Sequence, residues 1–256
     1  MKKSIPVLIA LVLCLIAATG ANAHEFIIKP VLYKVEPGQK LPLSVVSAHV
    51  FMVSEEMEPL NHVNVFCMSK KEKKEVKLFE NEILMTLDGQ IEPAGEGTLI
   101  VAGHRDGMIW TQTTTGWHQK SRKGLTGVIG SAKYEKFSKS LITVGRPCDN
   151  YARIIGQELE IVPISNPSEA KVGDELAFRI LFKGKPLSTN IFATYDGFSE
   201  NTNTYAYYSE TVGEGIARVK ITQPGIWMVR VQKEMEKPTK DYDKHVFRAV
   251  LTFRAG

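Results

Sequence analysis

Residues 175–187 read ELAFRILFKGKPL, a β-prone apolar run that ends at the turn-forming residues Gly184 and Pro186. Similar runs surround it at steady spacing, with glycine or proline between them. This rhythm is typical of an immunoglobulin-like or prealbumin-like β-sandwich of about 100 residues. The other runs are LEIVPI (159–164), NIFATYDG (190–197), GIARVKIT (215–222), GIWMVRVQ (225–232) and HVFRAVLTF (245–253). Residues 156–256 are therefore predicted to form such a sandwich.

The preceding part of the chain also indicates strands. Residues 41–53 alternate and are rich in branched side chains. Residues 97–102 and 108–113 are short strand candidates, separated by GHRDG, whose two glycines predict a turn. The charged run SKKEKKEVK, residues 69–77, is predicted to flank an exposed hairpin, because glutamates interrupt its lysines and no aromatic residues interleave.

One amphipathic helix is predicted within residues 133–141. Tyr134, Phe137 and Leu141 recur at helical spacing, with lysines on the other faces, and glycine and proline follow shortly afterwards. Residues 146–155 then interrupt the pattern. The expected fold class is all-β with minor α: an N-terminal β-rich domain with one helix (24–150) and the immunoglobulin-like or prealbumin-like β-sandwich (156–256).

The first 23 residues are predicted to be a signal peptide. Lys2 and Lys3 precede an uncharged apolar run, and the small residues of Ala21-Asn22-Ala23 suit a signal peptidase. The run is short for a membrane span, which needs about 20 apolar residues. Lipoprotein processing at Cys14 is the alternative, but bulky residues precede that cysteine. Cleavage after Ala23 removes 23 of the 256 residues, and the 233-residue product is expected in the periplasm.

Charge and cysteine content limit the function classes. The net charge of +4 falls to +2 when Lys2 and Lys3 are removed, which is too balanced to indicate a nucleic-acid partner. Cys67 and Cys148 remain in the mature chain. They form either one disulfide in an oxidising compartment or two separate thiols, and the sequence leaves both alternatives open.

Cleavage after Ala23 would give His24 two nitrogen donors. One is the imidazole, and the other is the new α-amino group, whose pKa is about 8 in model peptides. Together they can close a chelate ring on nickel, cobalt, copper or zinc, which suit imidazole and amine ligands. The alternative is that a histidine follows the cleavage site by chance.

Further donors are expected from three residues. His49 lies near the end of an apolar strand, shortly before Glu55 and two further glutamates, and His104 lies at a predicted strand end with Asp106 two residues on. Strand ends are places where side chains from neighbouring loops meet. The predicted metal ligands are therefore His24, His49, His104 and Glu55. A hydrogen-bonded core role for His49 and a turn-capping role for His104 remain open.

The other motifs are less informative. His62, His118 and His245 are weaker ligand candidates, and six histidines in 256 residues are no enrichment. No HExxH, CxxC pair, P-loop or GxSxG motif occurs. This absence removes the commonest hydrolase, zinc-ribbon and nucleotide-binding interpretations.

Several segments together are similar to a bacterial periplasmic family. They are HEFIIKP (24–30), SAHVFMVSEEMEP (47–59), GHRDGMIWTQTTTGW (103–117), KYEKFSKSLI (133–142), TYDGFSENTNTYAYYSET (194–211) and GIARVKITQPGIWMVRV (215–231). The chain resembles, over essentially its whole mature length, a domain-of-unknown-function family of the DUF4198 type. That family is described as a NikM-like nickel-uptake component, with related proteins called NikK in some nickel-transporter operons. The resemblance implies export, a β-rich build and handling of a divalent metal outside the inner membrane, with family histidines at His24, His49 and His104.

Three functions follow from these patterns. The leading one is a non-enzymatic periplasmic protein that binds nickel or cobalt, with copper favoured by the affinity order. As an accessory to uptake it would pass the ion to an inner-membrane metal permease, since the mature chain has no membrane span of its own. The second is a histidine-brace copper redox enzyme acting on polysaccharide, with Trp110 and Trp117 as sugar contacts. The third is a protein- or carbohydrate-binding module that uses Tyr195, Tyr205, Tyr207 or Tyr208.

Overall fold

The computed structural model describes residues 24–256, which form strands and short 3-10 helices, so the all-β class is confirmed. The predicted signal peptide, residues 1–23, lies outside the described residues. Within 24–256 no helix has the length and apolar character needed to cross a membrane. The strands are β1 (Glu25–Pro30), β2 (Lys34–Val35), β3 (Leu41–Ala48), β4 (Val63–Met68), β5 (Lys73–Glu75), β6 (Leu78–Asn81), β7 (Thr86–Ile91), β8 (Gly97–Thr113), β9 (Gly116–His118), β10 (Val128–Val144), β11 (Leu159–Pro163), β12 (Glu175–Phe182), β13 (Lys185–Pro186), β14 (Asn190–Tyr195), β15 (Tyr207–Glu210), β16 (Ile216–Lys220), β17 (Gly225–Glu236) and β18 (Lys244–Ala255). The 3-10 helices are η1 (Leu60–His62), η2 (Asp149–Ala152) and η3 (Pro167–Glu169).

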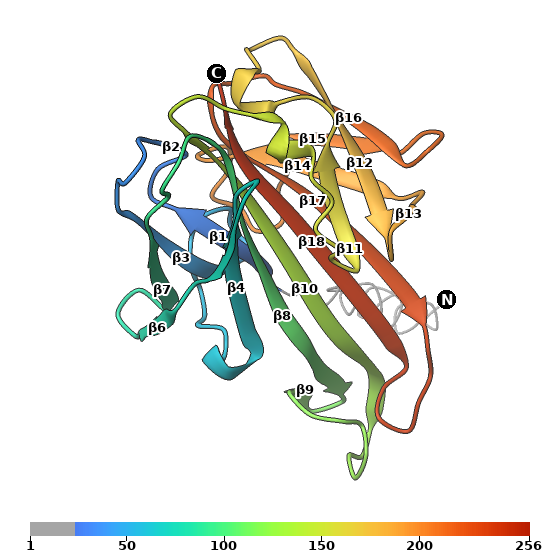
Figure 1. Cartoon of the computed structure of the whole chain (residues 1–256). Coiled ribbons are helices and arrows are strands. Elements are labelled where there is room, and N and C mark those ends of the chain that lie inside the picture. Colours follow the sequence, from blue (N-terminus) through green and yellow to red (C-terminus); the bar gives the residue numbers. More distant parts are fainter. Residues whose placement is uncertain (1–23) are drawn as a thin grey trace, which may run out of the picture.

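A ten-stranded sheet, here called the central sheet, runs through the molecule (Figure 1). Its strand order is β15-β14-β17-β18-β10-β8-β4-β5, with β2 beside β10 and β9 beside β8. All neighbours are antiparallel except that β10 pairs in parallel with β18 and with β2. The β10–β18 pairing joins strands from both sides of the predicted boundary at residues 146–155. The two predicted units therefore share one sheet.

Two smaller sheets cover opposite faces of the central sheet. The N-terminal sheet has the order β1-β3-β7-β6, and the C-terminal sheet consists of β11, β12, β13 and β16. In β8, Leu99 and Val101 pack with the N-terminal sheet, whereas Ile100 and Ala102 pack with the C-terminal sheet. Together with β14, β15, β17 and β18, the C-terminal sheet encloses the core of the predicted immunoglobulin-like sandwich. Figure 1 shows the N-terminal sheet (blue to green) and the C-terminal sheet (yellow to orange) on either side of the long strands.

The helix predicted within residues 133–141 is wrong, because these residues lie in β10. Phe137 faces the C-terminal sheet, whereas Ile142 packs with the N-terminal sheet. Lys136 and Lys139, which the helix prediction placed on polar faces, are buried in ion pairs. A strand that is covered on both faces has no solvent side, so its alternation is not visible in the polarity of its residues.

The turn predicted at GHRDG is also wrong, since β8 continues through this segment. The pairing with β10 shifts here, so that Asp106 and Gly107 both lie opposite Glu135 and form a β-bulge. Gly103 serves a different purpose. A Cβ atom at this position would lie 3.0 Å from Ile28 Cδ1, so β1 packs directly against the backbone of β8.

Other local predictions agree more closely with the structure. The strand predicted at residues 41–53 is present but ends earlier, at Ala48. SKKEKKEVK supplies the turn after β4 and the exposed strand β5 that pairs with it, so it flanks a hairpin as predicted. Residues 194–211, here called the tyrosine-rich segment, contribute an edge strand, β15, that the sequence did not indicate. Cys67 and Cys148 are both free thiols, which is the second of the two alternatives.

A buried ion pair joins the central sheet to the C-terminal sheet. Lys139 Nζ on β10 lies 2.6 Å from Glu160 Oε1 on β11, and the two side chains are 2% and 1% exposed. Glu160 also accepts the backbone N–H groups of Ile155 at 2.7 Å and Gly156 at 2.9 Å. The same carboxylate thus fixes both β10 and the connection from η2 to β11. Burial lowers the pKa of Lys139, and the Glu160 carboxylate opposes that shift.

A second buried network lies on the opposite face of β10. Glu58 Oε1 lies 2.8 Å from Lys136 Nζ, and Glu58 Oε2 lies 3.4 Å from Arg105 Nε on β8. Ser47 on β3 also donates its hydroxyl to Glu58, at 3.2 Å. Burial by itself would raise the pKa of Glu58, but Lys136 and Arg105 outweigh it and hold the pKa below its ordinary value. The carboxylate therefore stays ionised inside the protein.

Lys139→Met should lower the free energy of unfolding by about 3 kcal/mol or more, because it leaves the buried Glu160 carboxylate without its cation. Urea unfolding followed by circular dichroism measures this change. The matched control is Lys183→Met, which removes a pair with Glu158 (3.2 Å) whose side chains are both exposed. The control should change the free energy of unfolding by about 0.5 kcal/mol at most. Equal effects of the two substitutions would contradict the role given to burial.

Glu58 should make the folded state sensitive to acid. Its pKa is lower in the folded than in the unfolded chain, so its contribution is fully present above the unfolded pKa and is lost as pH falls through the folded pKa. Glu58→Gln removes this titration. Between about pH 5 and pH 3, the free energy of unfolding of the variant should therefore fall less steeply than that of the wild type. Urea unfolding at a series of pH values measures both slopes, and identical slopes would refute the prediction.

Candidate metal-binding site

The pairing of β1 with β3 brings His24 and His49 together. The two strands are antiparallel, with Glu25 opposite Ala48. His24, which directly precedes β1, and His49, which directly follows β3, therefore face each other at the end of the pair. Their ring centroids lie 3.8 Å apart, with the ring planes tilted by 42°. Register alone thus places two imidazoles from distant parts of the sequence in contact.

Contacts with the central sheet hold β1 in this register. The Ile28 N–H donates to Ser138 Oγ at 3.0 Å, and Ser140 Oγ donates to the Ile28 carbonyl at 2.6 Å. At the His24 end, the buried Glu25 carboxylate lies 2.7 Å from Arg230 Nε on β17. Burial would raise the pKa of Glu25, but Arg230 and Arg248 together outweigh it and the pKa lies below its ordinary value. His24 directly precedes Glu25 in the chain and is thereby fixed at the surface end of β1.

The loop after β3 turns back and places Glu55 against His49. The Val53 N–H donates to the Val50 carbonyl at 3.1 Å, and the Glu55 N–H donates to the Ser47 carbonyl at 2.9 Å. Glu55 Oε1 accepts the backbone N–H of His49 at 2.8 Å and that of Val50 at 3.3 Å. Its other oxygen, Oε2, lies 2.8 Å from His49 Nδ1. One carboxylate thus closes the loop and contacts the imidazole.

His24, His49 and Glu55 form a compact donor set, here called the His–His–Glu group, whose ligand atoms all lie within 4.8 Å of one another. Glu55 Oε2 lies 2.8 Å from His49 Nδ1 and 3.3 Å from His24 Nε2. Donors bound at about 2.1 Å in tetrahedral geometry are about 3.4 Å apart, so the spacing is close to that of a metal site. The three side chains are 21%, 17% and 33% exposed, so the group can be reached from solvent.

Glu56 adds a second carboxylate to this place. His24 Nδ1 lies 3.0 Å from Glu56 Oε1, so both ring nitrogens of His24 face carboxylate oxygens. A neutral imidazole has only one donor nitrogen, so the second contact becomes favourable when the ring is protonated or when a cation lies between the two groups. The hydrogen bond with His24 lowers the pKa of Glu56. For Glu55, burial acts upward, but hydrogen bonds from His49 and Val50 outweigh it and lower the pKa to about 2.

The C-terminal half of the chain also touches this place. The Asn203 N–H donates to the His49 carbonyl at 3.1 Å. Tyr205 and Thr204 line a small cavity together with His49 and Glu25. The tyrosine-rich segment therefore packs against the His–His–Glu group from the side of β14.

The structure does not bring His104 to the His–His–Glu group. His104 lies in the middle of β8, not at a strand end, and its ring stacks on Phe137, which faces the C-terminal sheet (centroids 4.8 Å apart). Its Nε2 lies 2.8 Å from Glu135 Oε1, and His245 Nε2 lies 2.9 Å from Glu135 Oε2. His104 thus belongs to a separate cluster on the other face of the central sheet. Burial lowers the pKa of His245 there, against the effect of the Glu135 carboxylate.

The weaker histidine candidates also lie outside the group. His62 Nδ1 lies 4.0 Å from Asp106 Oδ2, and His118 Nε2 lies 3.3 Å from Thr113 Oγ1. Sequence reasoning missed Glu135, because its segment was predicted to be helical and nothing local indicates the parallel pairing with β18. It also did not select Glu56, although this residue directly follows a predicted ligand.

Solved structures show only weak overall similarity. The D0-D1 domain of intimin is 11% identical at a TM-score of 0.24, covering 88% of this chain and 96% of that chain. The Escherichia coli adhesin FdeC is 10% identical at a TM-score of 0.25, covering 87% of this chain and 63% of that chain. Murine CEACAM1b is 10% identical at a TM-score of 0.23, covering 91% and 99%. At these scores the likeness carries no argument about function.

Sequence comparison identifies the family. No curated protein matches the chain. Residues 21–234 match the model of a family described as "Domain of unknown function (DUF4198)". This match spans most of the 256 residues and includes the His–His–Glu group. The chain therefore belongs to the DUF4198 family.

Proposed function

We propose that this chain is an exported protein that binds a divalent transition-metal ion through His24, His49 and Glu55 and passes it to a metal-uptake system. The observation that carries the proposal is the convergence of two imidazoles and one carboxylate within 4.8 Å. Glu55 and Glu56 both have lowered pKa values, so they are ionised at neutral pH and attract a cation.

The donor types narrow the choice of metal. Two imidazole nitrogens and one carboxylate oxygen suit nickel, cobalt, copper and zinc better than magnesium or calcium, which prefer oxygen ligands. Among the first-row ions the affinity order favours copper. Nickel and cobalt remain the ions that the family resemblance implies. Because the group is partly exposed, a bound ion can leave it again, as delivery requires.

His24 can contribute in two ways. In the first, the ring alone binds through Nε2, the nitrogen that already lies 3.3 Å from Glu55. In the second, Nδ1 and a free α-amino group chelate the ion, which requires cleavage after Ala23. The signal-peptide pattern of residues 1–23 supports both export and the second mode.

A surface beside the group suits contact with a delivery partner such as an inner-membrane permease. Ser54 Oγ donates to the Met85 carbonyl at 2.7 Å and so joins the Glu55 loop to the turn between β6 and β7. That turn exposes Ile83, which is 91% accessible, together with Leu84 and Met85. Clustered exposed apolar side chains often mark partner contacts. An ion bound by the group would thus lie close to the docked partner.

His49→Ala should weaken binding of nickel, cobalt or copper to the purified mature chain by about 100-fold or more, because loss of an outer-sphere partner alone costs 10–100-fold. Isothermal titration calorimetry measures the affinity. The matched control is His104→Ala, which removes an imidazole from the separate cluster with Glu135 and should leave the affinity unchanged. A result in which only His104→Ala weakens binding, or in which neither variant does, would contradict the proposed ligand set.

One added residue before His24 separates the two ligation modes. If the α-amine chelates the ion, a mature chain extended by a single alanine should bind copper at least about tenfold more weakly, because a peptide nitrogen replaces the amine. If the ring alone binds, both forms should have equal affinity. Mass spectrometry first confirms which residue begins each chain. Equal affinities would remove the amine from the mechanism and leave the His–His–Glu group as the site.

A further inference from the structure

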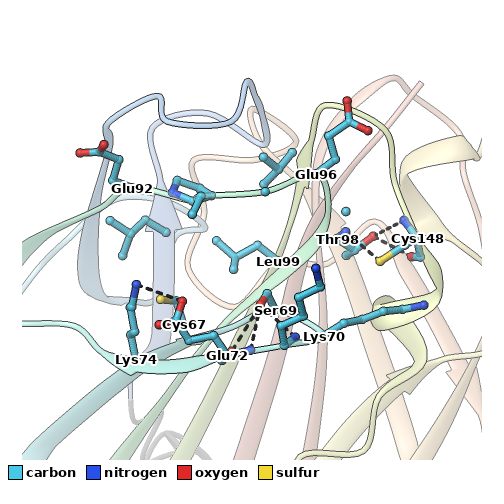
Figure 2. Close-up of a pocket in the computed structure, with 17 residues that line it drawn as sticks. Cys67, Ser69, Lys70, Glu72, Lys74, Glu92, Glu96, Thr98, Leu99 and Cys148 are labelled. Carbon is cyan, nitrogen blue, oxygen red and sulfur yellow. Dashed lines mark hydrogen bonds and ion pairs between the residues drawn. The ribbon is translucent and has the colours of Figure 1, made fainter.

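A cavity of about 430 Å³ lies at the edge of the molecule, away from the His–His–Glu group. The β4–β5 hairpin forms one side, and the connection between β7 and β8 forms the other (Figure 2). None of its lining residues belongs to the His–His–Glu group. Its volume lies in the range of small-molecule sites, about 300–1,000 Å³.

The inner walls are apolar or weakly polar. Ile91, Leu99 and Val144 line the interior, and both free cysteines of the described chain, Cys67 and Cys148, open onto it. Burial raises the pKa of the Cys67 thiol, so the thiol stays protonated and behaves as an apolar surface. Figure 2 shows Leu99 projecting into the space between the two sides. The interior therefore suits an apolar ligand body.

Three glutamates line the cavity; two of them point away from the hairpin side, and the third is paired with a lysine. Figure 2 shows the carboxylates of Glu92 and Glu96 pointing away from the hairpin side. Glu96 also accepts a hydrogen bond from Arg146 Nε at 3.0 Å. Glu72 is held by Lys74, at 2.9 Å. Among the described residues, no glutamate that lines the cavity therefore points an unpaired carboxylate into the space between its two sides.

The hairpin side supplies positive charge. Lys70 pairs with Asp149 and Lys74 with Glu72, and all four side chains are largely exposed. Exposed pairs of this kind are weak, so a ligand anion can replace either partner acid at little cost. Lys71 lines the cavity and has no ion pair within residues 24–256. An exposed lysine without an ion pair that lines an apolar cavity is the arrangement that an amphipathic anion needs.

We propose that this cavity binds a small molecule with an apolar body and one acidic group. The body lies against Leu99, Ile91 and Val144, and the acid lies at Lys71. This binding site is separate from the metal site proposed above, so either one can be absent without affecting the other.

The probe for the test is 8-anilinonaphthalene-1-sulfonate, which has an aromatic body and one anionic group and fluoresces when it leaves water. Lys71→Glu should weaken its binding to the purified protein about tenfold, the factor expected for loss of one charged contact. Ala94→Trp, at the exposed rim, should block the cavity and also weaken binding. The matched control is Lys73→Glu, because Lys73 lies over the Phe66 ring and does not line the cavity. It should bind the dye as the wild type does, and so should His49→Ala.

Thiol labelling locates the bound dye independently. Saturating dye should slow the alkylation of Cys67 and Cys148 by iodoacetamide, since both thiols line the cavity. Unchanged alkylation, or equal weakening by Lys71→Glu and Lys73→Glu, would overturn the proposal. Displacement by decanoate or by 2-naphthoate distinguishes a flexible from a flat ligand body, and failure of both would also overturn it. Decanol is the neutral control, and displacement by decanol as strong as by decanoate would remove the acidic group from the proposal.

Discussion

The central sheet is covered on both faces, and the rest of the structure depends on this constraint. β10 has no solvent side over much of its length, so each polar residue in it must find a partner inside the protein. Lys139 finds Glu160 on the C-terminal sheet, and Lys136 finds Glu58 on the opposite face. Because the two lysines are three residues apart in one strand, their side chains point to opposite faces of the sheet. The parallel pairing of β10 with β18 then makes the two halves of the chain one sheet.

The candidate metal site follows from how β1 is held on this sheet. Two serine hydroxyls of β10 bind the backbone of Ile28, and Arg230 binds the Glu25 carboxylate. These contacts fix the register in which His24 lies opposite His49. A slip of one residue would turn every side chain of β1 to the other face and separate the two rings. The donor set is therefore a product of strand register and of the loop closed by Glu55, not of closeness in the sequence.

Strands in the C-terminal half could be predicted from the sequence because short β-prone runs are separated there by turn residues. The runs between residues 159 and 253 are separated by glycine or proline, and the structure has strands at each of them. β10 could not be predicted in this way, because burial on both faces removes the polar alternation, and β8 was predicted only as two short strands, residues 97–102 and 108–113. A glycine pair in β8 also imitates a turn, although Gly107 belongs to a bulge and Gly103 accommodates a close contact from Ile28.

The same limits apply to the candidate site. His24, His49 and Glu55 could be selected because each stands next to a recognisable strand or cleavage signal, and the structure places them together. The position of His104 could not, because the face on which a residue of β8 lies depends on strand order and on the bulge. Glu135 and His245 meet His104 only through the pairing of β10 with β8 and β18, which no local pattern reveals.

Anomalous X-ray diffraction from crystals of the mature chain grown with nickel or copper tests the central claim most directly. The account predicts an anomalous peak between the His24 and His49 rings, at about 2.0–2.2 Å from their nitrogens and from a Glu55 oxygen. A peak at the His104, Glu135 and His245 cluster instead, or no peak in crystals that contain one equivalent of the metal, would contradict it.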